Sequence, residues 1–331
     1  MFDWFKSKQE KNININTNIY DEELLLKLLE RDGSWIDKKT PADSRLKMPD
    51  LTPLNMSIIL KPNSEISKFL LEKGAEFASV ITEGKHKGLD SLSLAISLKN
   101  NEIANELLSR GASPHFIAQS GEFEGLDALQ IAIKTGNTEI VASLLKKGAR
   151  FDRVILSGEC IHHSALDMAI IEKNNAIANL FMEDSKQFDQ FDLKSLIFKT
   201  HLSIKHENKK MFEFIIEKII EKSDCEALNL LKDHDILIHV SNIANLEMLD
   251  VLAEKFDISQ LFKKRINDKF SVFQTVLFES RYDFVNKLMQ FNVDIEEKIV
   301  DPNSSYHGLT ALQIATKNSD IKMMKILLKK L

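Results

Sequence analysis

The chain has 331 residues, of which 44% are hydrophobic and 28% are charged, a composition typical of a folded globular protein. Its net charge of −5 supplies no basic field for nucleic acid, so no nucleic-acid partner is expected. The two cysteines are too few for a disulfide framework and fit a reducing compartment. No apolar run approaches the roughly 18 residues of a membrane span. We therefore expect a cytoplasmic protein without a transmembrane segment.

Residues 1–20 are predicted to form an N-terminal tail. Phe2, Trp4 and Phe5 precede a polar run without helical periodicity, and the basic residues follow the apolar ones, so no secretory signal is predicted. The aromatic residues favour either a segment folded back onto the first repeat or a weak docking site for a membrane surface or a partner groove. Residues 21–33 are then predicted to form one amphipathic helix that a glycine ends.

A repeated pattern organises residues 52–182. Its clearest copy, GLDALQIAIKTGNTEIVASLLKKGA, begins at Gly125 and predicts two short amphipathic helices joined by a turn. Ala132 is expected where two helices touch and a small side chain is needed. Variants of the pattern begin at Thr52 (TPLNMS), Asp90 (DSLSLAISLKNNEIANELLSRGA) and Ser164 (SALDMAIIEKNNAIANLFM).

The connections between these repeats have a pattern of their own. Polar-Gly pairs recur at 83–84, 120–121 and 157–158, each after a β-forming flank. Such a pair supplies the positive φ of a tight two-residue β-turn. We therefore predict three extended fingers side by side, and a fourth at 299–308 whose turn lies at 302–303.

The pattern decays over residues 184–270. Helical pairs persist from Lys199 and from Asp235, but the small alanine becomes Ser203 and then Val240. The stretches between the pairs lack a finger turn, which indicates helical connectors within one solenoid. A domain break in this segment is the alternative.

Regular repeats return over 271–331, with copies that begin at Ser271 and at Thr310 (TALQIATKNSDIKMMKILL). The recurring helix pair, the helix opening and the terminal Gly-Ala together resemble the ankyrin repeat, whose helix-opening motif is T-P-L-H-x-A. The resemblance implies an all-α solenoid of stacked helix-turn-helix units with extended β-hairpin fingers, about eight repeats plus an N-terminal half-repeat, over 21–331. The repeats are longer than the family's usual ~33 residues, and the excess falls in the hairpin, so a long-hairpin variant is indicated. The resemblance is to an ankyrin-repeat protein of bacterial type.

Partner-facing positions in ankyrin repeats lie on the hairpin tips and on the exposed end of the first helix. Carried over to this sequence, the hairpin column is His86, Phe123, Cys160 and Tyr306. The helix column pairs Ser97 with Leu98, Lys134 with Thr135, Ile171 with Glu172, and Lys317 with Asn318. Aromatic side chains on exposed fingers are typical interface anchors. The alternative is that Phe123 and Tyr306 pack along their own fingers.

Cys160, His162 and His163 are the strongest candidates for chemistry, because Cys and His hold zinc and a thiolate beside a histidine is nucleophilic. A zinc site needs four ligands, however, and the neighbouring fingers offer only His86 and His115. His162 also stands where the other fingers carry a glycine. We therefore predict no metal, no cofactor and no catalytic residue.

Two aspartates resemble a carboxylate pair but fit structural roles. Asp127 opens a helix, where an N-cap aspartate is expected. Asp167 stands at the motif's histidine position, as do Gln130, Gln274 and Gln313. In the family this position hydrogen-bonds locally and between repeats, and these polar residues are expected to do the same.

The resemblance implies a non-enzymatic scaffold that binds another protein on its concave face and fingers, where rigid side chains lower the entropic cost of association. Ankyrin proteins of intracellular bacteria are often delivered into a host cell, so an effector or regulatory role follows by analogy. Two alternatives stay open. One is a metal-binding or cysteine-dependent enzyme that uses Cys160, His162 and His163. The other is a membrane-recruited adaptor that uses the aromatic N-terminus.

Overall fold

The structure, a computed structural model, describes most of the chain from residue 50 onward. The described residues are 36–37, 39, 50–60, 64–223, 226–261, 265–266, 270–291 and 293–329. The predicted tail at 1–20, with its three aromatic residues, and the predicted half-repeat at 21–33 lie outside them.

The chain divides into two compact units. The first is Met1–Met168 with Asn179–Phe181, and the second is Ala169–Ala178 with Met182–Leu331. The predicted division into a regular segment at 52–182, a degenerate one at 184–270 and a regular one at 271–331 stays a prediction.

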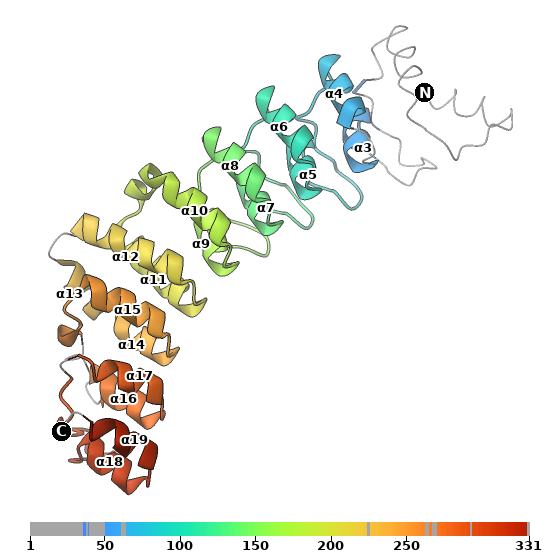
Figure 1. Cartoon of the computed structure of the whole chain (residues 1–331). Coiled ribbons are helices and arrows are strands. Elements are labelled where there is room, and N and C mark those ends of the chain that lie inside the picture. Colours follow the sequence, from blue (N-terminus) through green and yellow to red (C-terminus); the bar gives the residue numbers. More distant parts are fainter. Residues whose placement is uncertain are drawn as a thin grey trace. The chain divides into compact units, whose positions relative to one another are not determined.

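Helices in consecutive pairs, each joined by a short turn, build both units (Figure 1). The first unit holds α3 (Pro53–Leu60), α4 (Ser64–Glu72), α5 (Ser91–Ser97), α6 (Asn101–Ser109), α7 (Ala128–Lys134) and α8 (Thr138–Lys146). The next pair, α9 (Ala165–Ile171) and α10 (Asn175–Glu183), is divided between the units. The second unit continues with α11 (Leu193–Lys205), α12 (Lys209–Ser223), α14 (Ile236–Asn242), α15 (Leu246–Lys255), α16 (Val272–Phe278), α17 (Tyr282–Leu288), α18 (Ala311–Lys317) and α19 (Ile321–Leu327). Within the described residues this gives eight helix pairs, the predicted number of full repeats.

The helices stack in two layers within each unit. In the first unit, α5 contacts both α3 and α7, and α6 contacts both α4 and α8. In the second unit, α14 contacts both α11 and α16, while α12 contacts α15 and α17 contacts α19. First helices therefore pack on first helices and second helices on second helices (Figure 1). The predicted all-α repeat architecture is confirmed.

Local sequence explains where each pair begins and which faces it buries. Asp127 caps α7, and its side chain forms a capping box with Gln130, which satisfies backbone donors that the first turn leaves unpaired. Asn137 caps α8, because its side chain accepts from the backbone N–H of Ile140. Ala132 is fully buried, as expected for a small residue at a helix contact.

The predicted fingers are compact loops rather than pairs of extended strands. In the first, Ile81 N–H donates to the Leu89 carbonyl at 3.0 Å and Gly88 N–H donates to the Ile81 carbonyl at 2.7 Å. Beyond this base the chain turns through Gly84 at φ 78°, and Lys87 N–H donates to the Gly84 carbonyl at 3.3 Å. The positive φ expected at the polar-Gly pair is confirmed. The two-residue β-turn is not observed, because the extra residues fold into this turn instead of lengthening two arms.

The other fingers follow the same plan. The second and third fingers each hold a single isolated β-bridge at the base. The fourth turns at 302–303 as predicted, since Ser304 N–H donates to the Asp301 carbonyl at 3.1 Å. Its chain then folds through a second turn, in which His307 N–H donates to the Ser304 carbonyl at 3.0 Å.

Helical connectors replace fingers in the degenerate segment, as predicted. A 3₁₀ helix, η2 (Ser185–Gln190), precedes α11, and a short helix, α13 (Ala227–Asp233), precedes α14. After α15 the chain forms a second 3₁₀ helix, η4 (Ile258–Gln260). It then forms a two-stranded antiparallel pair of β1 (Arg265–Ile266) and β2 (Phe270–Ser271), which the sequence pattern did not predict.

Candidate partner-binding surface

The first three fingers lie in direct backbone contact. Gln119 N–H donates to the Gly88 carbonyl at 3.1 Å, which ties the second finger to the first. A Cβ built on Gly88 would stand 2.2 Å from the Ser120 carbonyl oxygen, and one built on Gly125 would stand 2.3 Å from that of Ser157. No other residue fits at such a distance, so these glycines let the fingers form a continuous row.

On the second finger, the hairpin column and the helix column meet. The Lys134 ammonium lies over the Phe123 ring, 5.6 Å from its centroid. The same ammonium lies 3.3 Å from the Glu122 carbonyl and 3.3 Å from a carboxylate oxygen of Glu159 on the next finger. The half-buried ring is therefore held by the C-terminal residue of its own first helix.

The fourth finger repeats this arrangement in the second unit. The Lys317 ammonium lies 4.8 Å from the centroid of the Tyr306 ring and 2.5 Å from the Ser305 carbonyl. The Tyr306 hydroxyl donates to Asn318 Oδ1 at 2.8 Å. All three predicted residues of this repeat therefore touch one another. The Tyr306 ring also packs on Phe278, with ring centroids 5.2 Å apart.

Sequence reasoning missed Phe278. It is the last residue of α16, the place that Lys134 takes in α7 and Lys317 takes in α18. The repeat register assigns Phe278 to the helix column, but the predicted column contains residues only from repeats that follow a finger turn. The Phe278 ring also packs against the ring of Phe270 on β2, with centroids 5.3 Å apart.

The first finger lacks such a pair. His86 is half-buried, and this burial lowers the pKa of its imidazole; the neighbouring Lys85 lowers it further, whereas Glu122 opposes both. The helix residue in register with Lys134 is Ser97, whose hydroxyl donates to a carbonyl of its own helix. Leu98 beside it is half-buried. Thr135, in the next repeat, likewise donates to its own helix.

The third finger is the most apolar. Val154, Leu156 and Ile161 are exposed, with Leu156 at 79%. Cys160 is a free, half-buried cysteine, and His162 is exposed with a φ of 70°.

The helix-column residues of the fourth repeat differ in exposure: Ile171 is half-buried and Glu172 is exposed. Among the described residues, no group of three or more His, Cys, Asp or Glu side chains is placed to hold a metal ion.

The polar residues of the repeat motif hold the scaffold together. Gln130 Oε1 accepts from the Asp127 N–H at 3.0 Å, and Gln130 Nε2 donates to the Arg153 carbonyl at 3.1 Å on the next finger. Arg153 in turn forms an ion pair of 2.7 Å with the buried Asp127 carboxylate. Asp167 accepts from the N–H and hydroxyl of Ser164. Both aspartates are therefore structural, and Gln130 bonds locally and between repeats as expected.

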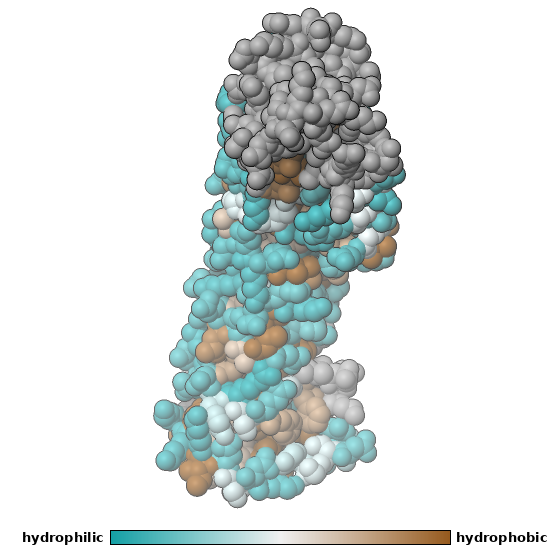
Figure 2. All heavy atoms as spheres, turned by 90° about the vertical axis from the view of Figure 1, so that its right-hand side faces the viewer, coloured by the Kyte–Doolittle hydropathy of each residue, from teal (hydrophilic) through white to brown (hydrophobic). Residues whose placement is uncertain are grey.

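The molecular face seen in Figure 2 is largely hydrophilic, with hydrophobic side chains in separate small patches. No helix in the described ranges is both long and apolar enough to cross a membrane. These features define a repeat protein of paired helices whose distinctive side chains lie on fingers and first-helix ends.

Comparison with known families agrees with this class. Residues 92–192 match the family model for ankyrin repeats, in three copies. Residues 92–192 of the chain are therefore ankyrin repeats. No curated protein sequence matches it. Ankyrin repeats generally mediate protein–protein interaction, and the family is typically a non-enzymatic interaction module.

Proposed function

We propose that this chain is a scaffold that binds a protein partner through the face formed by its fingers and the C-terminal ends of its first helices. The observation that carries the proposal is the repeated pairing of a finger aromatic with a helix lysine, Phe123 with Lys134 and Tyr306 with Lys317. Both rings are half-buried, so each still has surface to offer. An effector or regulatory role stays an expectation drawn from the resemblance.

Pre-ordering is the physical basis of the proposal. An exposed aromatic ring normally loses rotamer freedom on binding, which costs affinity. Here Lys134 restrains the Phe123 ring, while Phe278 and Asn318 restrain the Tyr306 ring. Aromatic anchors that are held in place and then buried by a partner commonly dominate binding energy.

The experiment compares two matched pairs of variants against a partner isolated by affinity capture. Phe123→Ala or Tyr306→Ala should weaken binding roughly 30-fold, the equivalent of about 2 kcal/mol for a buried anchor. Each is made singly, because a small partner could contact only one of the two fingers. Lys146→Ala and Lys147→Ala, exposed at the end of α8, are the controls and should leave affinity unchanged.

Stability is measured alongside affinity. Because both rings contact their own repeat, each alanine variant should lower the thermal midpoint slightly. Phe123→Leu and Tyr306→Phe keep most of this packing and separate the two effects. If both alanine variants retain full affinity, the partner binds elsewhere and the proposal fails.

A further inference from the structure

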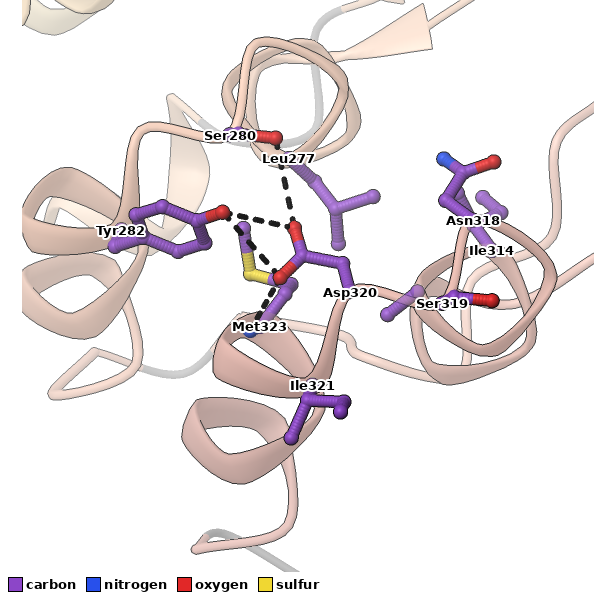
Figure 3. Close-up of a pocket in the computed structure, with 10 residues that line it drawn as sticks. Leu277, Ser280, Tyr282, Ile314, Asn318, Ser319, Asp320, Ile321 and Met323 are labelled. Carbon is purple, nitrogen blue, oxygen red and sulfur yellow. Dashed lines mark hydrogen bonds between the residues drawn. The ribbon is translucent and has the colours of Figure 1, made fainter.

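A pocket lies between the helix turns of the last two repeats, and Asn318, which accepts a hydrogen bond from the fourth finger's Tyr306, is among the residues that line it. Its volume is about 400 Å³, within the range of small-ligand sites. Side chains from α16, α17, α18 and α19 converge on it (Figure 3). The apolar part of its lining includes Leu277, Ile314 and Met323, and the polar part includes Ser280, Tyr282 and Asp320.

The equivalent spaces between other consecutive repeats of the second unit explain why this pocket exists. In two of them, the residue that opens the second helix reaches across to the first helix of the preceding repeat. Asn208 Nδ2 donates to the Ile170 carbonyl at 3.2 Å, and Arg281 Nη1 donates to the Ser241 carbonyl at 2.9 Å. The same position in the last repeat holds Asp320, the N-cap of α19. A carboxylate accepts hydrogen bonds and does not donate them. The short Asp320 side chain therefore leaves open the space that the longer Arg281 side chain fills in the preceding repeat.

The Asp320 carboxylate is fixed in place at the pocket wall. Its Oδ1 accepts from the Met323 N–H at 2.9 Å, which caps α19. The Tyr282 hydroxyl lies 3.3 and 3.2 Å from its two oxygens, and the Ser280 hydroxyl lies 3.5 Å from Oδ2 (Figure 3). Leu277 is the next-to-last residue of α16, and Ser241 is the next-to-last residue of α14. The Leu277 carbonyl is therefore equivalent to the Ser241 carbonyl that accepts from Arg281.

We propose that this pocket receives the guanidinium group of an arginine on a protein partner. Guanidinium carries five donors in a planar fork, which suits a fixed carboxylate and a nearby carbonyl at the same time. Arg281 shows one such contact within the chain itself. The aliphatic part of the side chain would pack on the apolar lining. The Tyr282 ring also accepts a cation, since the Lys322 ammonium lies 4.1 Å from its centroid.

The proposal rests on the proposed function only in taking the partner to be a protein, and the residues that would hold the arginine lie outside the fingers. The chain has three tyrosines, so tyrosine-selective isotope labelling of the full chain gives few signals. Tyr282→Phe assigns the signal of interest. The probe is acetyl-Gly-Gly-Arg-Gly-Gly-amide, compared with the same peptide carrying lysine or citrulline, the neutral isostere of arginine. We expect the arginine peptide to shift the Tyr282 signal at the lowest concentration and the citrulline peptide to bind at least about tenfold more weakly.

The decisive variant is Asp320→Asn, because asparagine caps a helix as well as aspartate does, while it removes the negative charge and replaces one acceptor oxygen with an amide donor. It should weaken arginine-peptide binding about tenfold or more, while an unchanged amide spectrum shows that α19 is intact. Asp283→Asn, an exposed carboxylate in the first turn of α17, is the matched control and should have no effect. Equal shifts with arginine and citrulline, lysine binding as tightly as arginine, no shift at all, or full binding by Asp320→Asn would each overturn the proposal. Phe123→Ala should leave this titration unchanged, so failure here and failure of the finger face are distinguishable.

Discussion

The chain connects consecutive helix pairs in two ways, through a finger loop or through a short helix. In the first kind, the loop before α5 or α7 lies against the next loop, and Gly88 and Gly125 make that approach possible. In the second kind, the short helices η2 and α13 lead into α11 and α14 in place of a loop. The comparison teaches that a repeated glycine can be required by the neighbouring repeat rather than by its own turn.

Two exceptions to the glycine pattern support this interpretation. His162 stands in register with Gly88 and has a φ of 70°, yet it lies on the third finger, which is the last finger before the helical connectors. Gly308 stands in the same register in the last repeat, and a Cβ built on it would meet nothing within 4 Å. At this register position, a Cβ is therefore sterically excluded where another finger follows, at Gly88 and Gly125, and finds space at Gly308, although all three glycines have a positive φ.

The largest loss of stability is expected where a Cβ would clash with the next finger. Gly125→Ala places a Cβ 2.3 Å from the Ser157 carbonyl oxygen, so the finger backbone must move. We expect a loss of about 3 kcal/mol or more in the free energy of unfolding, measured by urea denaturation. Gly308→Ala shares the positive φ without the clash and should cost only about 1 kcal/mol. Equal losses for the two variants would mean that φ alone explains the glycines.

The next effect concerns the helix contact that the two kinds of repeat share. Ala132 is fully buried, so Ala132→Leu should overpack the contact and cost about 1–3 kcal/mol in urea denaturation. The equivalent residue in a helix-connected repeat is Val240, which is also fully buried. Val240→Leu adds one methylene instead of several atoms and should cost less. A neutral Ala132→Leu would show that the fingered repeats are packed more loosely than the buried surface indicates.

Sequence reasoning recovered the elements that local chemistry determines. Asp127 at a helix start, Ala132 at a helix contact and the helical connectors all follow from capping, size and periodicity. The shape of the fingers did not follow, because a polar-Gly pair indicates a positive φ but not how the residues beyond it fold. The pairing of Phe123 with Lys134 was also out of reach. Both residues were assigned to partner-facing columns, but their contact depends on how the finger lies against its own helix.

A smaller effect depends on the buried caps of the fingered repeats. Asp90 caps α5 and is 5% exposed, and burial raises the pKa of its carboxyl. When the pKa of a carboxyl is higher in the folded state, its contribution to stability is fully present below the unfolded-state pKa of about 3.9. That contribution is lost as pH rises through the folded-state pKa. Asp90→Asn keeps a good cap without the charge. It should therefore raise the free energy of unfolding at pH 7 by on the order of 1 kcal/mol or less, and give no gain at pH 3.

The matched control for this pH effect lies in a helix-connected repeat. Asp192 caps α11 through the Ser195 N–H but is exposed to solvent. Asp192→Asn should not raise the free energy of unfolding at pH 7, because an exposed carboxylate carries no burial cost for the amide to relieve. A gain for Asp90→Asn that persists at pH 3 would show that the amide forms a better hydrogen bond and that charge burial is not the cause.

The smallest effect is expected at the end of the finger row. His162 holds a left-handed φ of 70°, which costs a residue with a Cβ about 1 kcal/mol or more. His162→Gly removes that strain but gives the unfolded chain more freedom, which offsets part of the gain. We therefore expect a net stabilisation of only about 0.5 kcal/mol in urea denaturation, while His162→Val should destabilise because a β-branched side chain fits this φ worse. If His162→Gly instead lowers stability by 1 kcal/mol or more, the imidazole contributes to the fold, and its place in the glycine register reflects a contact of its own.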